Sequence, residues 1–227
     1  MIGVTENLKL IRDLLASAAT EAGREPGTVK LLAVSKKQPL AKIVAAAGLG
    51  QRDFGENFVQ EGLDKISQTS HLDLTWHFIG HLQNNKTRAV AENFDWVHTI
   101  DKLKTARRLS DQRPEALAPL NVCLQVNVDA EPGKSGVAPD ELPDLATAVN
   151  GLPGLSLRGL MCLPRIRTDE HTQREPFAAL AKMAESLCSR GIDIDTLSMG
   201  MSGDFRAAIL EGSTIVRIGT AIFGERK

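Results

Sequence analysis

The chain contains 227 residues, of which 42% are hydrophobic and 24% are charged, and its formal net charge is -1. This length suffices for one sizeable core, so we expect a single domain over residues 1–227. Neither sign of charge forms a long run, so the chain lacks the electrostatic footprint of a nucleic-acid-binding protein, and we expect a small molecule or a protein as its partner.

The first segment predicts an amphipathic helix. Residues 1–19 place Leu8, Ile11, Leu14, Leu15 and Ala18 at helical spacing, without the basic start and solid apolar block of a signal peptide. No apolar run approaches membrane-spanning length. The three cysteines have no C-x-x-C spacing, which disfavours a disulfide framework and a zinc site and fits a reducing cytoplasm.

Short apolar or β-branched runs then alternate with helical patterns. Strands are expected at Leu31 to Ser35, Asp53 to Gly55, Thr75 to Ile79, Trp96 to Ile100, Asn121 to Val128, Leu155 to Met161, Thr196 to Gly200 and Thr214 to Ile218. Helices are expected at Leu40 to Ala47, Phe58 to Ser67, Lys86 to Glu92, Lys102 to Asp111, Pro139 to Val149, Arg174 to Ser189 and Phe205 to Leu210. This alternation predicts an α/β fold, a (β/α)8 TIM barrel with an extra N-terminal helix.

In such barrels the functional residues lie where strands end and helices begin. The first predicted strand ends in Lys36 and Lys37, whose side chains alternate between the two faces of the strand. Two interpretations stay open for them. Both can be solvated residues before the next helix, or one can stand at the barrel mouth, where partial desolvation favours a neutral amine that forms a Schiff base with a carbonyl compound.

The last two predicted strands end in small-residue turns. The segment LSMGMSGDF, residues 197–205, brings Ser202 and Asp204 to a helix start, and VRIGTAIFG, residues 216–224, brings Gly219 and Thr220 to the next strand end. Helix starts offer unpaired N–H groups, and phosphate sites recur in the loops after strands seven and eight. A plain helix N-cap remains the alternative for Ser202 and Asp204.

Arg217 lies inside an otherwise apolar predicted strand. Its side chain must either reach outward among the helices or point into the barrel toward a partner. If that partner is a heteroaromatic nitrogen, the guanidinium keeps the nitrogen unprotonated, because protonation would place two positive charges side by side.

Together these segments resemble a known family. The segments are LLAVSKKQP, FGENFVQE, WHFIGHLQNNK, GKSG, GLMC, LSMGMSGDF and STIVRIGTAIFG. They look like those of the pyridoxal phosphate homeostasis proteins, which are single-barrel relatives of the alanine racemase N-terminal domain. The resemblance runs from Val29 to Gly224, and the segments occur in the order of that family. The resemblance implies a barrel of pyridoxal phosphate fold type III. It also implies that Lys36 holds pyridoxal 5'-phosphate as an internal aldimine, with Lys37 facing away.

The same resemblance implies the other cofactor contacts. Arg217 would meet the pyridine nitrogen. The phosphate would be held by the turn from Ser198 to Ser202 and by the pair Gly219 and Thr220. The ring would be touched or lined by Asn57, His77 and Met161. Two of these residues have simpler interpretations: His77 can be a satisfied core histidine, and Asn57 can cap the next helix.

The sequence does not assign a single role to two further segments at the rim of the barrel. Lys134 lies in DAEPGKSG, which lacks the first glycine of a P-loop because position 128 is valine. Lys134 can be a solvated charge or, as a hypothesis, a second amine that accepts the cofactor from Lys36. The mixed-charge residues 162–175 are expected to form a loop that lies over the mouth.

Catalysis is not the favoured expectation. By the resemblance, a two-base racemase of this lineage needs a tyrosine from a second domain, and the sequence contains no tyrosine. Arg217 would also weaken the ring as an electron sink. We therefore expect a cytoplasmic, monomeric carrier that passes pyridoxal phosphate to apo-enzymes, with a racemase or lyase as the alternative and a Schiff-base aldolase as a further possibility.

Overall fold

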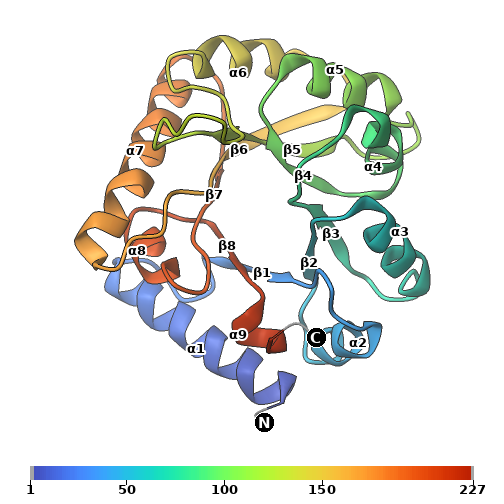
Figure 1. Ribbon diagram of the computed structural model, residues 1–227, viewed down its shortest axis with the longest axis vertical. Helices are drawn as coiled ribbons and strands as arrows, with labels where there is room; N and C mark the ends of the chain where they lie inside the picture. Colours follow the sequence, from blue (N-terminus) through green and yellow to red (C-terminus); the bar gives the residue numbers. More distant parts are fainter. Residues whose placement is uncertain (1–2, 226–227) are drawn as a thin grey trace.

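The computed structural model describes residues 3–225, and eight parallel strands within them close into a barrel in chain order, β1 to β8. The ring of strands is seen end-on in Figure 1, with helices around it. The strands are β1 (Lys30–Val34), β2 (Asp53–Glu56), β3 (Thr75–Phe78), β4 (Trp96–Ile100), β5 (Leu120–Val126), β6 (Leu155–Cys162), β7 (Thr196–Ser198) and β8 (Ile215–Ile218). The predicted TIM barrel is therefore confirmed.

Helices alternate with the strands, as the sequence predicts, with α1 before the first strand and α9 after the last. They are α1 (Val4–Glu21), α2 (Leu40–Gly48), α3 (Val59–Gln68), η1 (Asn84–Lys86), α4 (Thr87–Asn93), α5 (Leu103–Gln112), α6 (Leu142–Asn150), α7 (Glu170–Ser189), α8 (Phe205–Leu210) and α9 (Thr220–Phe223). The extra N-terminal helix is α1, and its predicted first two residues lie outside the described part. None of the described helices is long and apolar enough to cross a membrane.

The predicted loop at residues 162–175 is wrong in part. Cys162 still belongs to β6, and α7 begins already at Glu170. The reason is an N-cap, because the Asp169 carboxylate accepts hydrogen bonds from the N–H groups of His171 and Thr172. The connecting loop therefore covers only residues 163–169.

Alternation along the strands divides the core into two layers. Leu31 and Ala33 of β1 belong to the large cluster between barrel and helices. Leu32, on the opposite face, is fully buried and lies opposite Arg217 of β8 in the strand register. The barrel interior holds a separate small cluster of Trp96, Cys123 and Met161. All three cysteines are free, in agreement with the sequence.

Candidate functional site

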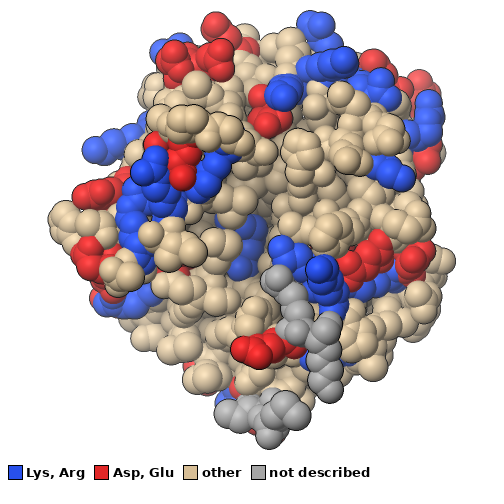
Figure 2. All heavy atoms as spheres, in the orientation of Figure 1, with Lys and Arg blue, Asp and Glu red and all other residues tan. Residues whose placement is uncertain are grey.

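A cavity of about 480 Å³ opens at the carboxyl ends of the strands. Its lining comes from residues that follow or end six strands: Lys36, Asn57, Ile79, Met161, Met201 to Asp204, Arg217, Gly219 and Thr220. The space-filling view in the same orientation as Figure 1 shows a hollow near the middle of this face, with Lys or Arg atoms inside it (Figure 2). Residues that are far apart in the sequence thus meet in one place because parallel strands end on the same rim.

The backbone around Lys36 is held on both sides. Ser35 before it is fully buried and donates its hydroxyl proton to Glu56 Oε1, while the N–H of Lys37 after it donates to Glu61 Oε1. Lys37 adopts a positive φ of 58°, and its Nζ lies 5.8 Å from the ring centroid of Phe58. Lys36 consequently lines the cavity, whereas Lys37 is exposed and turned away from it.

A buried ion-pair network anchors this turn, and sequence analysis missed it. Lys65 of α3 donates from Nζ to Ser35 O at 2.7 Å, to Glu56 Oε1 at 2.8 Å and to Glu61 Oε1 at 2.6 Å. Glu56 is 0% exposed, and its Oε2 has no hydrogen-bond partner among the described residues. Burial raises the pKa of Glu56, although its bonds to Lys65 and Ser35 oppose the rise. The network ties α3 to the ends of β1 and β2.

Arg217 enters the cavity from β8 and is only 5% exposed. Its Nη1 donates to the carbonyl and, at 2.8 Å, to the hydroxyl of Ser198, and its Nη2 donates to Cys162 O at 2.9 Å. No carboxylate of the described chain is within ion-pair distance of this guanidinium. Burial lowers its pKa, but an arginine in a protein stays charged. A fixed cation with neutral partners therefore faces the cavity.

The turn after β7 forms the more exposed side of the cavity. Gly200 has a φ of 94°, and a Cβ there would lie 2.7 Å from Ala208 Cβ, so this turn requires glycine. Asp204 is the N-cap residue of α8, as the N-cap alternative predicts for it, but its carboxylate accepts from Met201 N at 2.6 Å and not from an N–H of the helix. Within residues 3–225, the N–H groups of Ser202 and Gly203 donate to no other residue. They are free to bind an anion.

The sequence also singled out Asn57, Met161, His77 and Ser198. Asn57 and Met161 line the cavity, and Asn57 Oδ1 is a buried acceptor with no partner in the described chain. The cap of α3 is Phe58, so Asn57 is not its N-cap. His77 and Ser198 are fully buried inside the barrel and are not part of the cavity lining. Their positions therefore do not support direct contact of either side chain with a ligand in the cavity. His77 is a satisfied core histidine, bonded to His98 and Asp53.

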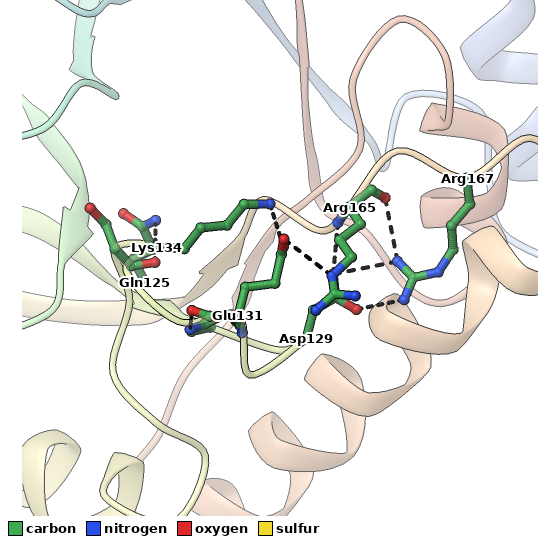
Figure 3. A network of polar contacts seen from close by, with 8 residues as sticks. Gln125, Asp129, Glu131, Lys134, Arg165 and Arg167 are labelled. Carbon is green, nitrogen blue, oxygen red and sulfur yellow. Dashed lines mark hydrogen bonds and ion pairs between the residues drawn. The ribbon is translucent and has the colours of Figure 1, made fainter.

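Lys134 is engaged in a network that joins two rim loops (Figure 3). Glu131 pairs with Lys134 through one carboxylate oxygen and with Arg165 Nε at 3.1 Å through the other. Asp129 pairs with Arg167, which lines the cavity. The loop after β5 is thus linked to residues 163–169, and Lys134 itself lies outside the cavity lining.

The fold and the cavity define a class, the (β/α)8 barrels with a cationic cavity at the carboxyl ends of the strands. The family model described as alanine racemase, N-terminal domain, matches residues 7–227. The chain therefore belongs to the alanine racemase N-terminal domain family, as its motifs predict.

Comparison with individual relatives shows which members of this family the chain is similar to. The pyridoxal phosphate homeostasis protein of Pseudomonas aeruginosa is 54% identical over 226 residues, covering 100% of this chain and 97% of the relative. The protein of the same name from Escherichia coli is 52% identical over 229 residues, covering 100% and 98%. PipY of Synechococcus elongatus, solved with PLP bound, is 37% identical with a TM-score of 0.82, over 92% of this chain and 100% of PipY.

Proposed function

We propose that this chain binds pyridoxal 5'-phosphate and serves the intracellular homeostasis of that cofactor. The observation that carries the proposal is the convergence of Lys36, Arg217 and the unbonded N–H groups of Ser202 and Gly203 on one cavity. Arg167 of the lining is paired with Asp129, so Lys36 and Arg217 are the remaining cations of the lining and Asp204 is its single carboxylate. This excess of positive charge suits a phosphorylated ligand. The names of the relatives and the PLP-bound structure of PipY support the same ligand.

Each lining residue has a role in the proposal. Lys36 supplies the amine that binds the cofactor covalently. Ser202, Gly219 and Thr220 hold its phosphate, since hydroxyl and backbone N–H groups gather at that side of the cavity. Asn57 offers its unpaired Oδ1 and Met161 an apolar surface to the ring.

Arg217 decides what the bound cofactor can do. Pyridoxal phosphate supplies an electron-withdrawing ring, which is strongest when its pyridine nitrogen is protonated. A guanidinium beside that nitrogen disfavours protonation, because the two positive charges would repel. The site is therefore suited to holding the cofactor rather than to fast chemistry on amino acids. As part of this proposal, the barrel acts as a cytoplasmic monomer that passes pyridoxal phosphate to apo-enzymes.

Reductive trapping tests the covalent assignment. Borohydride treatment of the protein loaded with pyridoxal phosphate, followed by peptide mapping, should label Lys36. The label should vanish in Lys36→Ala and persist in Lys37→Ala, a matched control one residue away whose side chain points out of the cavity. Label on another residue, or none in protein that has bound the cofactor, would refute the assignment.

The same loaded protein distinguishes a carrier from an enzyme. A carrier should leave the α-protons of a panel of amino acids in place when they are incubated in deuterated water, and it should restore activity to an apo-enzyme. Deuterium incorporation at a rate that Lys36→Ala abolishes would instead favour the racemase or lyase alternative.

A further inference from the structure

A continuous line of polar side chains crosses the interior of the barrel. It starts at Arg217 on β8, next to the cavity, and passes through Ser198 on β7, His98 on β4 and His77 on β3 to Asp53 at the start of β2. The successive distances are 2.8 Å, 2.7 Å, 2.9 Å and 3.0 Å. Ser198, His98 and His77 are each 0% exposed. The line therefore links the carboxyl end of the barrel with its amino end.

The far end of this line carries charge. Asp53 is also 3.1 Å from Lys30 Nζ. Lys30 and Asp53 both line a second cavity, at the amino ends of β1 and β2. The line thus runs from a buried cation at one end of the barrel to a partly exposed carboxylate at the other, with neutral groups between them.

The chemistry of the groups fixes the direction of every hydrogen bond. An ionised carboxylate can only accept, so His77 donates to Asp53 from Nε2. A neutral His77 then has an unprotonated Nδ1, which accepts from His98 Nε2. A neutral His98 likewise has an unprotonated Nδ1, which accepts the hydroxyl proton of Ser198. The Ser198 oxygen in turn accepts from Arg217, because a guanidinium can only donate.

The charge states agree with this direction. Burial lowers the pKa of His77 and lowers that of His98 well below its usual value, so both rings stay neutral. Burial alone would raise the pKa of Asp53, but the hydrogen bond from His77 and the charge of Lys30 outweigh it and lower the pKa. Trp96 stacks on His77 with ring centroids 5.4 Å apart, which restricts rotation of the imidazole.

We infer that Ser198, His98, His77 and Asp53 form a positioning relay that holds the Arg217 guanidinium in one orientation at the cavity. The relay fixes the Ser198 hydroxyl as an acceptor for Nη1, while two backbone carbonyls take further N–H groups of the same guanidinium. The remaining N–H capacity of Arg217 is directed at the cavity. Only the identity of what Arg217 meets there rests on the proposed function.

Histidine tautomers in the cofactor-free protein test the relay directly. With ¹⁵N-labelled histidine, nuclear magnetic resonance should show His77 and His98 neutral and protonated on Nε2 between about pH 6.5 and 8, a range that begins at the pKa of free histidine, where half of the free rings are charged. The exposed residues His71, His81 and His171 serve as internal references. A proton on Nδ1 of either buried ring, or a charged ring, would overturn the relay whether or not pyridoxal phosphate binds.

A hydroxyl deletion tests the connection to Arg217. Ser198→Ala should change the His98 signals and weaken pyridoxal phosphate binding by about three- to tenfold, the range of one ordinary hydrogen bond, because Arg217 keeps its bonds to two backbone carbonyls. Ser198→Thr keeps the hydroxyl and should restore both readouts. Ser110→Ala removes another buried hydroxyl, which lies on α5 and donates to Pro153 O, and it should change neither readout.

The outcomes separate the two proposals. If Ser198→Ala leaves both the His98 signals and the affinity at their original values, the relay is refuted while the proposed function stands. If the unmodified protein binds no pyridoxal phosphate, the proposed function fails, and the tautomers still decide the relay.

Discussion

Lys36 and Lys37 are neighbours with opposite surroundings. The sequence predicts that they face opposite sides, because side chains alternate along a strand, but it leaves open which one enters the barrel. The structure places Lys36 on the cavity and Lys37 over Phe58. A buried Ser35 and a positive φ at Lys37 fix this choice, and neither is visible in a residue pattern.

Arg217→Glu tests the residue that we assign to the pyridine nitrogen. A carboxylate at this position would accept a hydrogen bond and favour the protonated nitrogen, so the visible absorption spectrum of the bound cofactor should change. Arg88→Glu is the matched control, because the Arg88 side chain is 68% exposed and, among residues 3–225, pairs only with Glu92 on its own helix. The spectrum of the control should equal that of the unmodified protein.

The buried carboxylate also meets acceptor oxygens of Ser198 and Cys162, so Arg217→Glu should be less stable, by a few kcal/mol. Arg217→Gln removes the positive charge without introducing a carboxylate, and provides a second, milder variant if the first fails to fold. A normal spectrum in either variant, measured on protein that still binds the cofactor, would contradict the assignment of Arg217.

The residues that sequence analysis missed share one property. His98, Asp53 and Lys65 act through partners on other elements, at sequence separations of 21 for His98 with His77, 24 for His77 with Asp53 and 30 for Lys65 with Ser35. Which side chains meet across strands depends on strand register and barrel curvature. Strand-end residues such as Asn57 and Thr220 were predictable, because parallel strands place their ends on one rim whatever the register.

At the scale of elements, most helices and strands follow from alternating patterns, and the exceptions are local. The start of α7 was predicted at Arg174, but Asp169 caps the helix and moves its start to Glu170. The short helix α9 (Thr220–Phe223) was not predicted, because four residues are too few for a periodic pattern.

Lys65→Met tests how α3 is fixed to β1 and β2. Removing the cation leaves the fully buried Glu56 carboxylate without its ion-pair partner, so the free energy of unfolding should fall by about 3–5 kcal/mol. Urea unfolding followed by tryptophan fluorescence measures the loss. The double variant Lys65→Met with Glu56→Gln removes both charges and should regain most of the stability. A loss below about 1 kcal/mol in the single variant, the size of an exposed pair, would show that the network is not anchoring the helix.

At the scale of the whole molecule, the barrel separates two ends with different roles. The carboxyl end holds the cavity with Lys36 and Arg217, and the amino end holds Lys30 and Asp53. Eight strands in regular alternation with helices were enough to predict closure. The polar interior was not predictable to the same degree, because a histidine in an apolar strand is as compatible with the core as with a ligand site.

The two interior histidines predict how stability depends on pH. Burial lowers the pKa of His77 and His98 in the folded state, whereas in the unfolded chain both titrate near pH 6.5. At pH values between the folded-state pKa and the unfolded-state pKa, the unfolded chain binds more protons than the folded protein. The free energy of unfolding is therefore highest above about pH 7 with respect to these two rings, and it falls as the pH decreases. From pH 7.5 to 5.5 the two rings together should cost about 2–3 kcal/mol, if both remain neutral when folded.

Urea unfolding at the two pH values measures this cost, and His77→Gln or His98→Gln should each reduce it by about half, since each removes one titrating ring. Glu56 and Asp204 have the opposite effect on the free energy of unfolding. Burial raises the pKa of both carboxyl groups, so they take up protons in the folded state as the pH falls. Their contribution is common to the unmodified protein and to both variants. The difference between variant and unmodified protein therefore isolates the histidines, and an unchanged pH dependence in both variants would mean that these rings accept protons in the folded barrel.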